Sequence, residues 1–177
     1  MKRLALSALT ALAAAFVLAT SGATAPAHTI DWKLSGTAVW SGSGFLAQSF
    51  AIHGTVAGLG SYSGTLNAGT YFTTETCGPQ CAPVTGTIQF DTHRGSLTTT
   101  VDPQGLVTVT SIGSGTTYSF SLPLTIADGT KSFAHASGSL SLSYGSTLPT
   151  NQPDCSVCPI VDGGELTGQV LRSPSAG

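Results

Sequence analysis

The sequence predicts an all-β protein, most simply an antiparallel β-barrel of about eight strands. Three observations predict this class. Apolar residues alternate with Ser and Thr through most of the chain, which is the two-residue period of half-buried strands. Only 8% of the residues are charged, and the residues that favour solvent-exposed helices are scarce. Glycine recurs inside the alternating segments and not only between them.

The first 27 residues have the organisation of a secretory signal peptide. Lys2 and Arg3 precede an apolar stretch over residues 4–18, which is shorter than a comfortable membrane span. The small residues Ala25 and Ala27 predict cleavage after Ala27, which leaves a single β-barrel domain of residues 28–177. The expected location is secreted, cell-wall or periplasmic, with no membrane span after cleavage.

The alternating segments predict strands separated by turns. In the clearest segment, Tyr118, Phe120 and Leu122 alternate with polar residues or proline. We expect strands near residues 30–40, 47–57, 60–67, 84–91, 95–101, 105–112, 116–126, 132–145 and 163–171. Turn residues predict turns at 91–95, 102–105 and 127–129.

Six glycines share a pattern in which the glycine lies between two apolar residues on the inward face of a strand. They are Gly36, Gly54, Gly64, Gly86, Gly138 and Gly168. Because glycine weakens a strand, the repeated placement needs a cause, and the crowded lining of a small closed barrel supplies one. A β-sandwich is the alternative. Pro123 lacks a backbone donor in mid-strand, which predicts either a bulge or an open seam beside it.

Residues 129–138, with the sequence GTKSFAHASG, resemble the GTGRFAGATG segment of small secreted bacterial β-barrels similar to the allene oxide cyclase and dirigent barrels. The shared positions are Gly129, Thr130, Phe133, Ala134, Ala136 and Gly138. Lys131, Ser132 and His135 depart from the segment. The resemblance implies an antiparallel barrel of about eight strands. It implies no particular activity, because no functional residue of the plant relatives is matched here.

Four cysteines lie in two polar, proline-bearing segments that we expect to be loops. They are Cys77, Cys81, Cys155 and Cys158. Export favours disulfides over a metal site or redox-active thiols. Two local pairs are the preferred connectivity, and the two cross-paired connectivities stay open. Local bridges would rigidify loops, whereas cross-pairing would tie the last strand to the sheet.

Six inward aromatic residues are the candidate ligand-binding residues. They are Trp32, Tyr62, Phe90, Tyr118, Phe120 and Tyr144. A barrel of about eight strands is either filled by its own side chains or holds one small ligand, so core packing is the competing and favoured interpretation. The tyrosine hydroxyls need hydrogen-bond partners if they are buried.

The sequence predicts no catalytic residue, metal site or cofactor. Its carboxylates fall in turns, loops or outward positions, and no nucleophile-elbow motif occurs. His53 is expected on an outward face and His93 in a turn, so the histidines give no metal pair. Nucleic-acid binding is disfavoured, because the chain has six Lys and Arg and two of them belong to the leader.

These features predict an exported, non-catalytic β-barrel that serves as a structural module or binds a small apolar molecule. A cell-wall component is the other expected partner. Two alternatives stay open, namely an isomerase or cyclase acting inside the barrel and a cell-surface adhesion or assembly domain. An inward carboxylate or His lining a cavity would favour the enzyme. A sealed interior with an exposed apolar patch would favour assembly.

Overall fold

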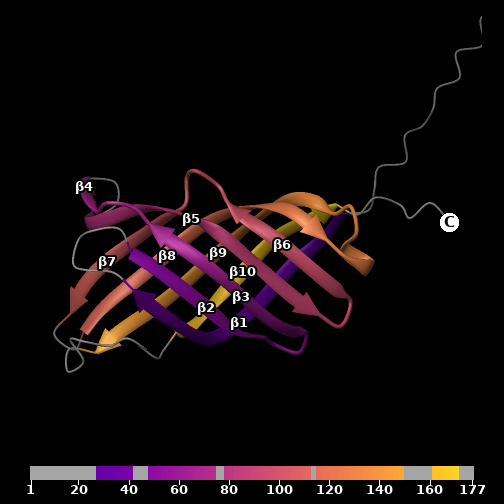
Figure 1. Cartoon of the computed structure of the whole chain (residues 1–177), viewed down its shortest axis with the longest axis horizontal. Coiled ribbons are helices and arrows are strands. Elements are labelled where there is room, and N and C mark those ends of the chain that lie inside the picture. Colours follow the sequence, from indigo (N-terminus) through magenta and orange to yellow (C-terminus); the bar gives the residue numbers. More distant parts are fainter. Residues whose placement is uncertain (1–26, 42–47, 75–77, 113–114, 150–160, 172–177) are drawn as a thin grey trace, which may run out of the picture.

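The computed structural model describes residues 27–41, 48–74, 78–112, 115–149 and 161–171. These residues form ten strands and one 3₁₀ turn (Figure 1). The strands are β1 (Ala27–Ser41), β2 (Gln48–Val56), β3 (Gly60–Ala68), β4 (Phe72–Thr74), β5 (Gly78–Thr92), β6 (Gly95–Val101), β7 (Leu106–Ile112), β8 (Gly115–Gly129), β9 (Ser137–Pro149) and β10 (Val161–Leu171), and the turn is η1 (Lys131–Phe133). The all-β prediction is confirmed.

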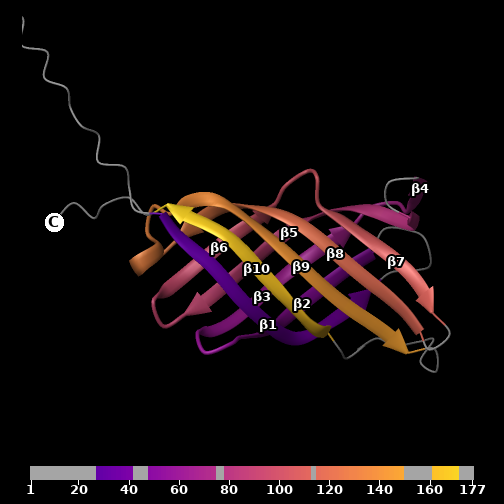
Figure 2. The same cartoon turned by 180° about the vertical axis from the view of Figure 1, so that it is seen from behind.

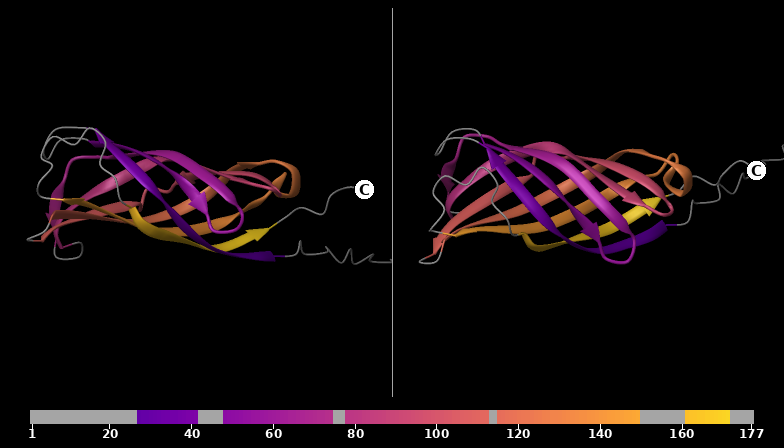
Figure 3. Two further views of the ribbon diagram at one scale, coloured as in Figure 1. Left: turned by 90° about the horizontal axis from the view of Figure 1, so that it is seen from below. Right: turned by 60° about the horizontal axis from the view of Figure 1, so that its bottom comes forward.

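The strands form one antiparallel sheet that closes on itself. Neighbouring strands follow the order β3-β2-β1-β10-β9-β8-β6-β5, and β5 pairs back onto β3 from Gly60↔Thr92 to Ala68↔Val84. Opposite views show β1, β2 and β3 crossing one side of the barrel and β8, β9 and β10 the other (Figures 1 and 2). The strands run obliquely to the long axis (Figure 3). The barrel prediction is therefore confirmed, and the sandwich alternative does not apply.

The ten strands occupy eight positions around the barrel, because two of these positions are each shared by two strands that lie end to end. β6 and β7 lie end to end between β5 and β8 and pair with both of them. β4 continues the position of β3 along β5, where Phe72 pairs with Cys81. The turn predicted at 102–105 is present, with the Gly105 amide donating to the Asp102 carbonyl at 2.9 Å. It interrupts one strand position and does not reverse the chain, because β5 and β8 continue past it.

Pro123 lies opposite this interruption. Its carbonyl accepts a hydrogen bond of 2.9 Å from the Asp102 amide, so it faces the interrupted position, and on its other side it is in register with Ser141 of β9. In an antiparallel strand the nitrogen and the carbonyl of one residue point to the same side. The proline nitrogen, which carries no hydrogen, therefore faces the 102–105 loop between β6 and β7 and not a paired strand. The β8–β9 register runs through Pro123 without a shift, and the barrel is closed. Neither the bulge nor the open seam predicted for Pro123 is therefore present, and a loop in the neighbouring strand position takes their place.

The connection between β8 and β9 lies later in the chain than predicted. Residues 127–129, expected to form a turn, belong to β8, and β9 begins at Ser137 instead of residue 132. Residues 130–136 form the turn, in which Lys131 and His135 have φ angles of 51° and 58°. Such left-handed conformations usually carry glycine. The sequence did not predict this turn because Lys131 and His135, and not glycine, occupy its two positive-φ positions.

The six glycines share the inward face of their strands with buried residues, as predicted. Gly36 and Gly54 are cross-strand partners, and a Cβ on either would lie 2.1 Å from a backbone oxygen of the other's strand. At the other four glycines the nearest atom is likewise a backbone oxygen of the adjacent strand, at 2.1–2.6 Å. These glycines allow the close strand approach that tight coiling requires.

Candidate functional site

The barrel interior is packed with aromatic rings. Five of the six candidate residues, Tyr62, Phe90, Tyr118, Phe120 and Tyr144, are buried, and Trp32 is half-buried. Phe50 of β2 joins them and meets Phe120 and Tyr118 edge-on, with ring centroids 5.1 and 5.6 Å apart. Phe50 was not among the predicted ligand-binding residues, although it lies on the apolar face of its strand. The predicted residues thus meet inside the barrel, and their binding of a ligand stays a prediction.

Tyr62 and Tyr144 form a hydrogen-bonded pair in this interior. Their hydroxyl oxygens are 2.9 Å apart, and their rings stand nearly perpendicular at 86°. Glycines make room for both: a Cβ at Gly36 would lie 2.6 Å from the Tyr62 hydroxyl, and one at Gly164 would lie 2.6 Å from the Tyr144 ring. Burial raises the pKa of both tyrosines. The pair is therefore uncharged near neutral pH, and its members satisfy each other.

Other polar groups of the interior are also paired. Tyr71 donates a 2.5 Å hydrogen bond to the side-chain carbonyl of Gln48, which is only 5% exposed. Thr99 donates from its hydroxyl to the Ile88 carbonyl at 3.1 Å. Burial raises the pKa of Tyr71 and of Tyr118. Buried polar groups without partners would be costly, and the hydrogen bonds of Tyr71 and Thr99 avoid that cost.

Among the side chains whose burial the structure describes, no carboxylate or imidazole is buried. Asp31 and Glu165 lie on the outer face, as predicted, and both approach Lys33. The hydrogen bond to Glu165, more than any other contact, raises the pKa of Lys33. His53 and His93 are exposed, as expected. Within the same residues no three His, Cys, Asp or Glu side chains gather as metal ligands would.

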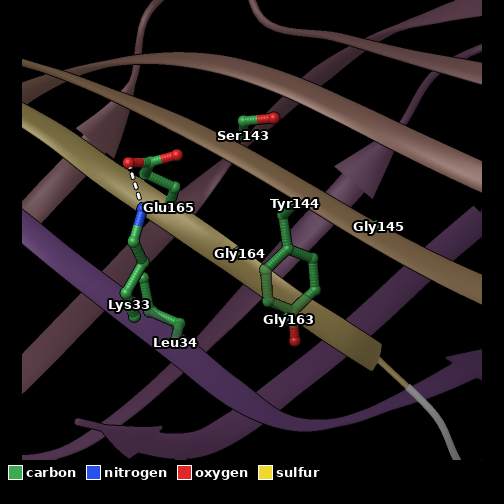
Figure 4. A pocket seen from close by; sticks show the side chains of 8 residues that line it. All are labelled: Lys33, Leu34, Ser143, Tyr144, Gly145, Gly163, Gly164 and Glu165. Atoms are coloured by element: carbon green, nitrogen blue, oxygen red, sulfur yellow. Dashed lines mark hydrogen bonds and ion pairs between the residues drawn. The ribbon is translucent and has the colours of Figure 1, made fainter.

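The outer wall carries a depression of about 400 Å³ beside this ion pair (Figure 4). Lys33 and Glu165 border it from β1 and β10, and Ser143 borders it from β9. Gly145 and Gly163, which face each other across β9 and β10, leave the wall without side chains there. The two charges of the depression neutralise each other, so it offers little to a charged ligand.

A second cavity, of about 80 Å³, lies at the end of the barrel that carries the β2–β3 and β5–β6 turns and η1. We call it the hairpin-end cavity. It is lined by His28, Thr29, Ile30, Trp32, Leu59, Thr92, Arg94 and Phe133. Trp32 packs edge-on against Phe90 and Phe133, with centroids 5.6 and 6.3 Å apart. Of the six candidate aromatics, only Trp32 lines this cavity.

Cys81 lies in β5, so the expectation that it belongs to a loop is wrong. Its segment extends the strand because Gly78 and Cys81 pair with β4. Its sulfur is fully buried, takes part in a disulfide and lies 3.5 Å from the Phe72 carbonyl oxygen. Cys77, Cys155 and Cys158 fall outside the described residues, as does the leader up to residue 26. The connectivity therefore stays a prediction.

No family model, curated protein or solved structure matches the chain. Among the described residues, no helix has the length and apolar character needed to cross a membrane. The fold and the two cavities therefore carry the functional interpretation.

Proposed function

We propose that the chain is an exported, non-catalytic β-barrel that serves as a structural module or holds a small apolar ligand. One observation carries this proposal: aromatic side chains pack together in the described part of the barrel interior, and the hydroxyls of Tyr62, Tyr71 and Tyr144 have hydrogen-bond partners. A filled barrel of this size is a rigid body and not a reaction chamber. Any ligand would have to be small or to bind at an end of the barrel.

The interior chemistry supports a non-catalytic role over an isomerase or cyclase. Acid–base catalysis needs a titratable group with a pKa near the working pH. The interior tyrosines have pKa values raised by burial, which moves them away from that range. The buried part of the described chain offers no carboxylate or imidazole in their place.

The side chains whose burial the structure describes form no apolar patch that would favour assembly. Among the described residues, the exposed large apolar side chains are Phe72 and Leu171, at 43% and 42% exposure. They lie on β4 and at the end of β10, at opposite ends of the barrel (Figure 1). A contiguous patch is what marks an interaction surface, and these two residues do not form one.

Export and family are parts of the same proposal. Export is supported by Cys81, which is disulfide-bonded. The proposed likeness to the allene oxide cyclase and dirigent barrels concerns the β8–β9 turn. A Cβ at Gly129 would lie 2.2 Å from the Phe133 carbonyl oxygen, and the Phe133 side chain is buried. These roles are structural, which agrees with a motif that implies a fold and no activity.

Native mass spectrometry of the exported protein tests the proposal. We expect a chain that begins at His28, has no free thiols and carries no large cofactor. A retained leader or free cysteines would contradict export. A large molecule that stays bound until the protein unfolds would contradict the filled interior and favour the enzyme.

A further inference from the structure

The hairpin-end cavity differs from the packed interior because it has unfilled space. One water-sized occupant needs on the order of 10–15 Å³, so a cavity of about 80 Å³ has room for roughly five to eight non-hydrogen atoms. Its lining is mixed. Ile30 and Phe133 are buried and Trp32 and Leu59 are half-buried, and together they form the apolar half, whereas His28, Thr29, Thr92 and Arg94 form the polar half. The space suits one compact apolar group, such as a single ring.

The rim of this cavity carries a positive charge. Arg94 is exposed, and its backbone is fixed: its amide donates to the Thr92 hydroxyl at 3.1 Å, and its carbonyl accepts from the Ser132 amide and hydroxyl at 3.1 and 2.6 Å. The ion pairs found within the described residues involve Lys33 and not Arg94. A guanidinium on a fixed backbone and without a carboxylate partner is suited to bind one in bidentate fashion.

Acidic groups on neighbouring strands do not neutralise this rim. Asp91 accepts two hydrogen bonds from the Gln89 side chain, at 2.9 and 3.1 Å. Asp31 lies 3.9 Å from the Lys33 ammonium. His28 is also at the rim, and cleavage after Ala27 would place the new α-ammonium group there as a second positive charge. The cavity thus combines an apolar pocket with a cationic edge.

We propose that the hairpin-end cavity binds a small carboxylate that has a compact apolar body, of which aryl carboxylates are the simplest class. The ring lies among Trp32, Leu59 and Phe133, and the carboxylate binds the Arg94 guanidinium. The proposal adds a site at the end of the barrel and does not depend on a ligand in the packed interior.

A titration of the full chain with benzoate, followed by amide NMR shifts, tests the site. Benzyl alcohol is the matched probe, because it keeps the ring and lacks the charge. We expect benzoate to bind at least tenfold more tightly than benzyl alcohol. The largest shifts should fall on residues 28–32, 59, 92–94 and 133. Equal affinity for the two probes, shifts elsewhere or no benzoate binding would overturn the proposal.

Variants distinguish the contribution of the Arg94 charge to the affinity from that of the apolar pocket. Arg94→Gln should lower the affinity for benzoate at least tenfold and leave that for benzyl alcohol unchanged, whereas Arg94→Lys should retain part of the preference. Lys33→Gln, at the outer depression, is the control and should change neither affinity. An Arg94→Gln variant that folds and binds benzoate as the parent does would refute the role of Arg94. Failure of these tests would leave the filled, exported barrel intact, because mass spectrometry tests that separately.

Discussion

Two groups of aromatic side chains line the same barrel, and they differ in what surrounds them. Around Tyr62 and Tyr144, neighbouring glycines let the rings lie against the adjacent strands, and each hydroxyl has the other as its partner. Around Trp32, the hairpin-end cavity leaves space, and Arg94 stands at its edge. Aromatic content alone therefore does not distinguish a core from a site. Unfilled volume alone does not either, because Tyr144 borders the outer depression, where Lys33 and Glu165 neutralise each other. A charge without a partner beside the unfilled volume makes the distinction.

The first prediction concerns the glycines that allow neighbouring strands to approach each other closely around the tyrosines. A methyl group at Gly54 would lie 2.1 Å from the Ser35 carbonyl oxygen, so Gly54→Ala should lower the free energy of unfolding by about 4 kcal/mol or more. Gly145→Ala is the matched control, because a Cβ there meets no atom within 4 Å. It should change stability by less than about 0.5 kcal/mol. Chemical denaturation of both variants measures the contrast, and equal effects would show that strand approach is not limiting.

The second prediction concerns the inner wall of the hairpin-end cavity. Phe133 is 2% exposed and closes that end against Trp32, so Phe133→Ala should cost about 3–5 kcal/mol by removing packing and enlarging the cavity. Phe72→Ala removes the same ring from an exposed position and should cost less than about 0.5 kcal/mol. Thermal and denaturant unfolding report the difference. A stable Phe133→Ala variant would mean that the end of the barrel is not packed.

The third prediction concerns the tyrosine pair. Tyr62→Phe or Tyr144→Phe should each cost about 1–3 kcal/mol, because each leaves one buried hydroxyl without its partner. The double variant should cost less than the sum of the two, with a coupling of at least about 0.5 kcal/mol. A double-mutant cycle in denaturant measures this coupling. Additive losses would argue that the two hydroxyls do not depend on each other.

The smallest expected effect is a stabilisation in the β8–β9 turn. Lys131 and His135 have positive φ angles, which cost a side-chain-bearing residue roughly 1–2 kcal/mol. Glycine removes that cost, but it lowers stability by about 0.5–1 kcal/mol because it loses more conformational entropy on folding. Lys131→Gly and His135→Gly should therefore each stabilise the barrel by up to about 1 kcal/mol. A loss of stability would indicate that these side chains make contacts worth more than the strain.

The sequence predicted the barrel because two local signals agreed with the global fold. The alternation of residues such as Phe120 and Leu122 with serines marks the strand faces, and inward glycines such as Gly54 mark where strands approach closely. Both signals are properties of single strands. They can therefore be recognised in the sequence without knowing which strands pair with each other.

The features that the sequence did not reveal have a different origin, because they depend on partners far along the chain. Residues 102–105 contain ordinary turn residues, and only β5 and β8 running past them show that the chain does not reverse. Cys81 joins a strand through pairing with Phe72. In the sequence Arg94 resembles any solvent-exposed turn residue. Only the fold shows that it borders the same cavity as Trp32 and Phe133. Such features become visible only when distant segments are placed together.

An alkaline titration of the tyrosines tests the filled interior most directly. Burial raises the pKa of all four tyrosines of the chain, whereas in the unfolded chain they titrate near pH 10. Tyrosine ionisation should leave stability unchanged below about pH 10 and lower it as the pH rises further, because the unfolded chain then releases protons that the folded chain keeps. A packed barrel predicts that tyrosinate absorbance appears together with unfolding. A folded barrel whose tyrosines ionise near pH 10 would show that water reaches them, and it would contradict the filled interior.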